Sequence, residues 1–151
     1  MHIYQRPDPD QARALLESSG LPISDLSDTS FDHFFACGSK EHPVGIIGLE
    51  QLGENGLLHS LVIAEKNRGK GGGKALVETL ERYAQNLGLQ TLYLLTDTAD
   101  KFFLKLGYQV VDRAEVPEAI QQTAEFTHLC GDQAVVMKKD VHTGQFMSIY
   151  P

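Results

Sequence analysis

Apolar and polar residues follow two different periods along this chain. Short apolar runs rich in β-branched and aromatic residues are typical of strands, whereas apolar residues three and four apart are typical of amphipathic helices. Two apolar runs, residues 44–51 and 57–63, flank the turn sequence Gly53-Glu54-Asn55-Gly56 and predict a hairpin. Further strands are expected over residues 2–6, 33–37, 91–95, 108–113 and 134–138.

Helical spacing recurs in four segments. The first helix begins at Asp8-Pro9, which supply a cap and a proline for the first turn, and it ends at Gly20. Its apolar stripe consists of Ala12, Leu15 and Leu16. Further helices are expected over residues 74–87, 99–106 and 117–126, and residues 23–30 form a loop or a short helix. Strands followed by strand–helix alternations indicate an α/β domain with a mixed sheet.

Length and charge narrow the function classes. A chain of 151 residues is long enough for one domain with a sizeable core, which we expect over residues 1–139, with residues 140–151 as a tail. The net charge of −7 argues against nucleic acid as a general partner. Two cysteines, Cys37 and Cys130, are too few for a disulfide framework and have no metal-ligand spacing. No run reaches membrane-spanning length and the N-terminus has no signal core, so a cytoplasmic location is expected.

The segment Arg68-Gly69-Lys70-Gly71-Gly72-Gly73 carries the most specific chemistry. It lies between a predicted strand, residues 57–63, and a predicted helix, residues 74–87. Glycines allow positive φ and close approach of the backbone, and N–H groups at a helix start attract anions. This arrangement suits a pyrophosphate, and Arg68, Lys70 and Lys74 would add a local basic patch.

Two common glycine-rich rules do not fit this loop. A nucleotide P-loop fails because Arg68 stands where the first glycine belongs and Ala75 where a metal-binding hydroxyl belongs. The dinucleotide rule fails because its third glycine would fall on Lys74. The pattern R-x-x-G-x-G does fit, at Arg68, Gly71 and Gly73, and resembles the acetyl-CoA-binding motif of the GNAT N-acetyltransferases. The alternative is a flexible surface loop with glycine helix caps.

The resemblance extends over about residues 2–139 and implies a mixed, mostly antiparallel sheet flanked by helices. It implies acetyl-CoA as co-substrate, a small-molecule amine acceptor and a homodimer. In the family, open backbone groups of the strand before the loop pair with the pantetheine arm. The residues that match these cofactor contacts are Leu61, Val62, Ile63, Arg68, Gly69, Lys70, Gly71, Gly72, Gly73, Lys74 and Phe103.

A second segment, Phe102-Phe103-Leu104-Lys105-Leu106-Gly107-Tyr108, resembles the family's F-Y-x-x-x-G-F stretch. The family's tyrosine can protonate the leaving thiolate, but Phe103 has no proton to give. Tyr108, Tyr93, Ser60 or water could take over this role. Phe103 in place of tyrosine also raises the alternative of a domain that binds acetyl-CoA with little or no turnover.

The implied reaction is acetyl transfer to an amine, which a base must first deprotonate. Glu50, His59 and Asp97 are the candidate bases. Glu50 could instead be an exposed carboxylate at a strand end, His59 a packed histidine, and Asp97 the cap of the next helix. A backbone N–H near Leu61 or Val62 could stabilise the oxyanion.

The segment from Val111 to Ile120 resembles a narrower group, the arsenic-resistance N-acetyltransferases, and its spacing is similar to that of N-acetylglutamate synthases. An amino-acid-like acceptor follows from this resemblance, and acceptor specificity could lie in the helix expected at 117–126. Arg113 could contact an acceptor carboxylate, or pair with Glu115 or Asp112. Cys37 is expected in the core rather than at an arsenic site. A protein-acetylating enzyme is the remaining alternative.

Overall fold

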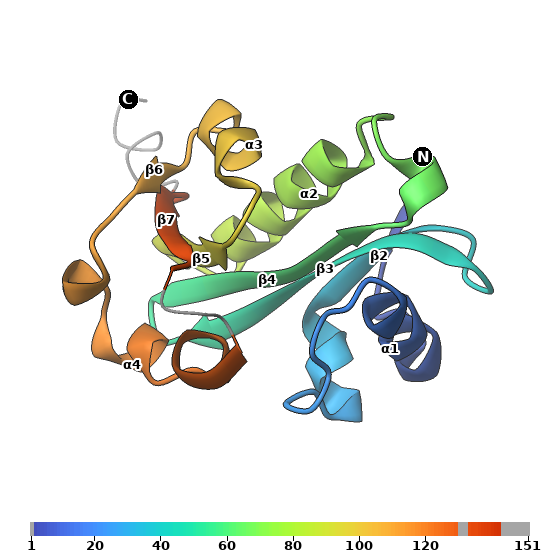
Figure 1. The fold of residues 1–151 in the computed structure, drawn as a ribbon, viewed down its shortest axis with the longest axis horizontal. Helices are drawn as coiled ribbons and strands as arrows, with labels where there is room; N and C mark the ends of the chain where they lie inside the picture. The colour runs from blue at the N-terminus through green and yellow to red at the C-terminus, as the bar shows by residue number, and fades with distance from the viewer. Residues whose placement is uncertain (1, 130–132, 143–151) are drawn as a thin grey trace. The chain divides into compact units, whose positions relative to one another are not determined.

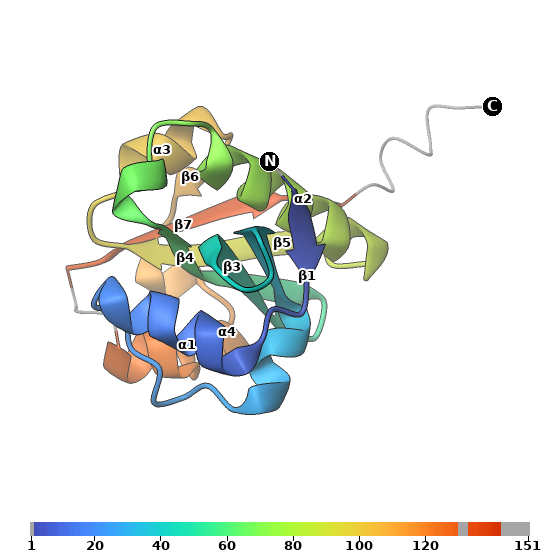
Figure 2. The ribbon, with the colours of Figure 1, turned by 90° about the vertical axis from the view of Figure 1, so that its right-hand side faces the viewer.

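The computed structural model describes residues 2–129 and 133–142 (Figure 1, Figure 2). Seven strands within these residues form a sheet in the order β1-β2-β3-β4-β5-β7-β6, flanked by helices, which confirms the predicted mixed, mostly antiparallel α/β class. Contacts divide the chain into two compact units. The first unit contains residues 1–50 and 58–80, and the second contains residues 51–57 and 81–151.

In the first unit, β1 (Ile3–Gln5), β2 (Phe34–Gly38) and β3 (Pro43–Leu52) are antiparallel neighbours. The register pairs Phe34 with Gly48 and Phe35 with Ile47. The predicted hairpin is confirmed, since β4 (Asn55–Ile63) follows a turn in which Gly53 adopts a φ of 64°. This turn is shorter than the sequence suggested, because Asn55 already belongs to β4.

The first helix, α1 (Pro9–Ser18), forms as its sequence predicts. Asp8 caps it by accepting a hydrogen bond of 3.1 Å from the Gln11 N–H. The predicted stripe of Ala12, Leu15 and Leu16 is buried in one cluster with side chains of β2 and β3. This burial explains the position of α1 against one face of these strands (Figure 2).

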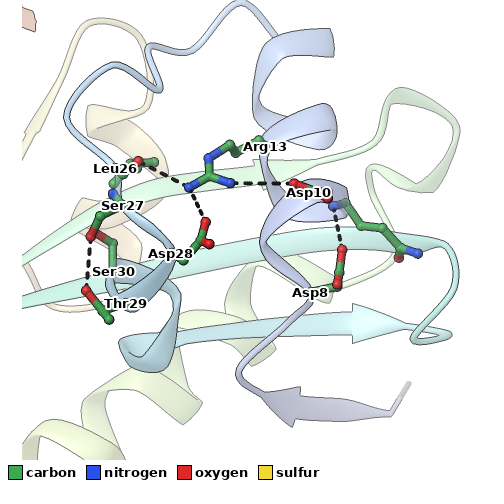
Figure 3. Close-up of polar contacts among 9 residues, drawn as sticks. Asp8, Asp10, Arg13, Leu26, Ser27, Asp28, Thr29 and Ser30 are labelled. Carbon is green, nitrogen blue, oxygen red and sulfur yellow. Dashed lines mark hydrogen bonds and ion pairs between the residues drawn. The ribbon is translucent and has the colours of Figure 1, made fainter.

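The outer side of α1 is tied to a 3-10 helix at Asp28–His33. The Arg13 guanidinium lies 2.7 Å from an Asp28 carboxylate oxygen and 3.6 Å from Asp10, and it donates to the Leu26 carbonyl at 3.4 Å (Figure 3). Arg13 thereby joins α1 to the loop at Leu26 and to the 3-10 helix that precedes β2.

The opposite face of the first unit is covered by the first half of α2 (Gly72–Asn86). A Cβ built on Gly45 would lie 2.7 Å from Ile63, 2.8 Å from Cys37 and 3.2 Å from Leu76, so glycine is needed for this close packing. Cys37 is fully buried, as expected of a core residue. Helix α2 begins two residues earlier than predicted and ends before Gly88, whose φ is 81°.

The second unit is built around β5 (Thr91–Thr96), which pairs in parallel with Asn55–Leu57 and antiparallel with β7 (Val135–Asp140). A two-residue strand, β6 (Gln109–Val110), pairs with β7. Helices α3 (Asp100–Lys105) and α4 (Glu118–Gln121) lie on opposite sides of these strands (Figure 1). The buried cluster on the α4 side consists of Leu57, Tyr93, Val116, Ile120 and Val136.

Two predicted elements in this unit were wrong in length. The strand expected at 108–113 is limited to β6, because the chain turns into a 3-10 helix at Arg113–Glu115. The helix expected at 117–126 breaks into α4 and a π-helix at Glu125–Leu129. Thr123 causes the break, since its buried hydroxyl donates to the Ile120 carbonyl and accepts from the Phe126 N–H.

The last strand continues to Asp140, and Val141 is buried. Cys130 and residues 143–151 of the expected tail lie outside the described residues. Across the described ranges, none of the helices combines the length and apolar character that crossing a membrane requires.

Candidate functional site

The glycine loop lies between β4 and α2 in the first unit. A short 3-10 helix at Glu65–Asn67 leads into it, and Gly69 and Gly71 adopt left-handed φ values of 79° and 84°. A Cβ built on either residue would meet no atom within 4 Å. Glycine is therefore required by the backbone conformation at these two positions and not by crowding.

The end of the loop is the start of α2. The first helical hydrogen bond runs from the Ala75 N–H to the Gly71 carbonyl at 3.1 Å. The N–H groups of Gly72, Gly73 and Lys74 precede that bond, so they have no acceptor within the helix. Together with the positive end of the helix dipole they can bind an anion, and the exposed Lys70 and Lys74 can add charge beside it.

Arg68 fixes the loop to the strand before it. Its Nε donates a hydrogen bond of 3.0 Å to the Ile63 carbonyl, although the side chain is otherwise exposed. Next to this contact, a shallow hollow is lined by Ala64, Glu65 and Lys66. Of the predicted strand contacts, Val62 is buried in the α1 cluster, whereas Leu61 and Ile63 are half-buried.

Strand β4 is irregular at Ser60, which has a φ of 60°. His59 and Val62 both face the α1 side: the His59 ring lies 5.4 Å from the Phe34 ring, and Val62 shares the Phe34 cluster. Residues three apart lie on opposite faces of a regular strand. The left-handed Ser60 therefore bulges the strand and turns both side chains to one side.

Two of the three candidate bases are brought to the same face. Gly48 and Glu50 are two residues apart in β3 and so point the same way. A Cβ on Gly48 would lie 3.0 Å from the His59 Cε1 atom, which places the histidine on that face as well. Sequence reasoning missed Gly48, whose lack of a side chain makes room for both Phe34 and His59.

The pKa values of Glu50 and His59 are shifted in opposite directions. Burial raises the pKa of the half-buried Glu50 carboxyl above its usual value, and the nearby Asp25 carboxylate raises it further. Burial lowers the pKa of His59 to about 4, so its imidazole is neutral at neutral pH. The His59 Nδ1 atom lies 2.8 Å from the Ser60 Oγ atom, within hydrogen-bond distance.

The remaining predicted site residues belong to the second unit. Asp97 is exposed and follows β5, but it does not cap α3 as the alternative reading proposed. The Thr96 hydroxyl accepts the Ala99 N–H at 2.9 Å instead. Asp97 as a base stays a prediction.

Phe103 is only 4% exposed, and its ring packs edge-on against Phe102 and Tyr108 at 5.0 and 5.4 Å. Its side chain is a core contact of α3, and a contact with the cofactor stays a prediction. The Tyr108 hydroxyl donates to a Glu81 carboxylate oxygen at 2.9 Å, and Lys139 lies 3.1 Å from the same oxygen. Sequence reasoning missed this cluster, because its members are far apart in the chain.

The Arg113 side chain also has contacts with neighbouring residues. Its guanidinium lies 4.9 Å from the centre of the Phe126 ring, and its Nη2 donates to the Ala134 carbonyl at 3.2 Å. The π-helix thus holds the arginine that the sequence offered as a carboxylate contact. Whether it touches an acceptor stays a prediction.

Comparison with known proteins identifies the family to which this chain belongs. The acetyltransferase (GNAT) family model matches residues 2–108. A protein of Bacillus subtilis (strain 168) that carries the name putative acetyltransferase is 34% identical over 104 residues, which cover 62% of this chain and 68% of that protein.

Solved structures share the fold. The N-acetylglutamate synthase of Neisseria gonorrhoeae, complexed with coenzyme A and N-acetyl-glutamate, aligns with a TM-score of 0.79 at 18% identity, over 93% of this chain and 35% of that one. This chain thus spans about a third of that enzyme. Rv2747 of Mycobacterium tuberculosis, complexed with CoA, aligns with a TM-score of 0.75 at 18% identity over 93% and 99% of the two chains. An aminoglycoside 6'-acetyltransferase type Ii aligns at 0.64 and 28% identity over 93% and 97%.

The family match, over residues 2–108, includes strands β1 to β5, the glycine loop and α3. This chain belongs to the GNAT acetyltransferase family and is an acetyl-CoA-dependent N-acetyltransferase.

Proposed function

We propose that this enzyme moves the acetyl group of acetyl-CoA to the amine of a small, amino-acid-like acceptor by direct attack. The observation that carries the proposal is the loop at residues 68–73, with Gly69 and Gly71 in left-handed conformations directly before α2. The N–H groups at the start of α2 bind the pyrophosphate, and Arg68, Lys70 and Lys74 add positive charge.

The pantetheine arm follows β4 from the loop towards the bulge. Leu61, Val62 and Ile63 offer it backbone groups, as an added strand would pair with a sheet edge. The thioester then lies near Ser60, on the side of the strand that leads to Glu50 and His59. A backbone N–H near Leu61 binds the developing oxyanion.

Glu50 removes the proton that the acceptor ammonium must lose before it attacks. Its raised pKa supports this role, because a base works best when its pKa lies near the working pH. Its position on the same face as His59 supports it further. Asp25, which raises the pKa of Glu50, also makes this part of the first unit attractive to a cationic amine.

The acceptor class rests on resemblance and on fold. Two neighbours in fold are an N-acetylglutamate synthase with N-acetyl-glutamate and a CoA complex of Rv2747. The segment from Val111 to Ile120 resembles the arsenic-resistance group, so an arsenic-bearing amino acid is included among the candidate acceptors.

Cofactor binding is tested by placing a negative side chain at the pyrophosphate. We expect Gly71→Glu to weaken acetyl-CoA binding at least a hundredfold in isothermal titration, through charge repulsion. Gly20→Glu is the matched control, since Gly20 also has a left-handed φ, of 75°, and open space on its Cβ side. Equal affinity in the two variants would show that the pyrophosphate binds elsewhere.

The reaction is tested by following thiol release with a panel of acceptors. The panel contains acidic and neutral amino acids, an arsenic-bearing amino acid, an aminoglycoside and a lysine-containing peptide. We expect turnover with an amino acid. Turnover with the aminoglycoside or the peptide alone would contradict the acceptor class, and tight binding without any turnover would indicate a binding module.

A further inference from the structure

His59 and Ser60 form a hydrogen-bonded pair inside the proposed active site. The His59 Nδ1 and Ser60 Oγ atoms are 2.8 Å apart, and both side chains are half-buried. The two residues are consecutive in β4, at the bulge where the strand leaves its regular path. The pair therefore has a fixed position along the strand that we assign to the pantetheine arm.

Ser60 is held in a conformation that suits glycine better than serine. Its φ of 60° is one of only two positive values among the described non-glycine residues, the other being 61° at Arg6. Backbone outliers of this kind gather at functional sites, where the surrounding structure maintains them. Since glycine would meet the backbone requirement without strain, the hydroxyl is the feature that needs an explanation.

The partner ring is held from two sides. Phe34 packs against it at 85°, with the ring centres 5.4 Å apart, and Gly48 lies beneath its Cε1 atom. Burial lowers the pKa of His59 to about 4, so the ring is neutral at neutral pH, with one protonated nitrogen and one that can accept a proton. A neutral imidazole can take a proton at one nitrogen while it releases another from the second.

The reaction leaves one proton to be delivered. An acceptor ammonium loses two protons on becoming an amide N–H: one before it attacks and one from the tetrahedral intermediate. The leaving thiolate must gain one proton. Phe103 has none to give, the buried Tyr108 hydroxyl already donates to Glu81, and Tyr93 is 7% exposed within the α4 cluster.

We propose that His59 and Ser60 relay the second amine proton to the leaving thiolate. The intermediate's N–H⁺ gives its proton to His59 Nε2, while His59 Nδ1–H passes its proton to Ser60 Oγ. Ser60 Oγ–H passes its own proton to the sulfur as the C–S bond breaks. Ser60 is again a hydroxyl afterwards, His59 is again neutral, and exchange with water restores the first tautomer.

This inference rests on the proposed function, because the relay needs the thioester beside the bulge. It also gives the two ionisable groups on that face, Glu50 and His59, different protons to transfer. Glu50 releases the first proton to solvent, and the His59–Ser60 pair handles the second proton without any net change of charge. The relay explains how the enzyme works without the tyrosine that Phe103 replaces.

The test removes the hydroxyl without introducing strain. We expect Ser60→Gly to lower kcat tenfold to a hundredfold, with KM for acetyl-CoA changed less than twofold and the melting temperature unchanged or higher. Arg6→Gly is the matched control, since it relieves the same kind of strain outside the site. It should leave kcat and KM unchanged.

A second variant tests the coupling. His59→Gln should lower kcat by a similar factor, and the double variant should fall no further than the lower of the two, because both residues act in one relay. A Ser60→Gly enzyme with kcat within twofold of the wild type would overturn the relay while leaving the proposed function intact. Wild-type protein that binds acetyl-CoA but transfers to no acceptor would overturn both.

Discussion

At the scale of single residues, two groups on one face of the first unit depart from their usual ionisation in opposite directions. Burial acts on both, but it favours the neutral form of each: a protonated carboxyl at Glu50 and an uncharged imidazole at His59. Both lie on the face that Gly48 marks in β3, and the bulge at Ser60 lets Val62 share that face with His59. These two shifts have separate consequences for activity and stability.

Replacing Glu50 should separate its catalytic from its structural effect. The raised pKa means that the folded state holds this proton more tightly than the unfolded state, so the charged carboxylate destabilises the fold at neutral pH. Glu50→Gln should therefore raise the melting temperature slightly at pH 8 while lowering kcat about a hundredfold. Melting curves and steady-state rates on the same samples measure both effects.

Asp25→Asn supplies the control for this assignment. It removes the second cause of the raised pKa of Glu50, so the acidic limb of the kcat/KM profile should move to lower pH with little loss at the plateau. An unchanged acidic limb in both variants would assign the base to another residue.

His59 should make the fold sensitive to mild acid. Its folded pKa of about 4 lies below the unfolded value of 6.5, so its contribution to stability is complete above pH 6.5 and is lost as the pH falls towards 4. The loss is on the order of 3 kcal/mol. The difference in melting temperature between wild type and His59→Gln should shrink over this interval, and a constant difference would contradict the burial of the ring.

At the scale of elements, α2 connects two different tasks. Its first turn supplies the N–H groups that we propose bind the cofactor, and its second half carries Glu81. In the second unit, Lys139 of β7 bonds both Glu81 carboxylate oxygens, at 3.2 and 3.1 Å, and the Leu106 carbonyl at 2.8 Å. Tyr108 adds its hydroxyl to the same carboxylate, so the cluster holds together α2, the turn after α3 and β7.

Removing only the cation of this cluster should lower the free energy of unfolding more than removing the cation and the carboxylate together. The Glu81 side chain is 13% exposed and that of Lys139 is 29%, so Lys139→Met leaves a largely buried carboxylate without its cation. We expect a loss of about 3 kcal/mol in urea unfolding. Adding Glu81→Gln should restore at least half of that loss, while keeping an acceptor for Tyr108.

Lys138→Met is the control on the same strand. Lys138 is half-buried and pairs in register with Tyr93 and Gln109, away from the cluster. Its replacement should change stability by less than about 0.5 kcal/mol. An equal loss at both positions would show that the ion pair contributes nothing specific.

At the scale of the whole molecule, the net charge and the charge at the glycine loop have opposite signs. The chain carries a net charge of −7, yet Arg68, Lys70 and Lys74 gather at the loop. Exposed charges act over about 10 Å at moderate salt, so this local patch can attract a pyrophosphate despite the overall repulsion. Binding should therefore depend on the patch and not on the net charge.

Salt dependence tests this separation. The dissociation constant for acetyl-CoA should rise several-fold between about 50 mM and about 500 mM salt, and Lys70→Gln with Lys74→Gln should weaken binding at low salt and flatten the dependence. Arg6→Gln with Lys40→Gln changes the net charge by the same two units elsewhere on the first unit. A matching effect in this control would make net charge the cause.

Some elements could be predicted from the local sequence, because the residues that specify them lie within or next to the element. Asp8 and Pro9 start α1, the period of three and four buries Ala12, Leu15 and Leu16, and the glycine pattern after an apolar strand specified the loop and its family. These features depend on neighbours along the chain, so they can be predicted without knowing the fold. The mixed sheet followed from the order of the elements.

Tertiary structure alone decided what depends on residues distant in sequence. The strand expected at 108–113 kept only the two residues of β6, which pair with the distant β7. No local pattern could show that Ser60 takes a left-handed conformation, that Gly48 makes room for His59, or that Glu81 meets Lys139. The bulge at Ser60, the burial of His59 and the ion pair between α2 and β7 all depend on packing partners, and these partners meet only once the chain has folded.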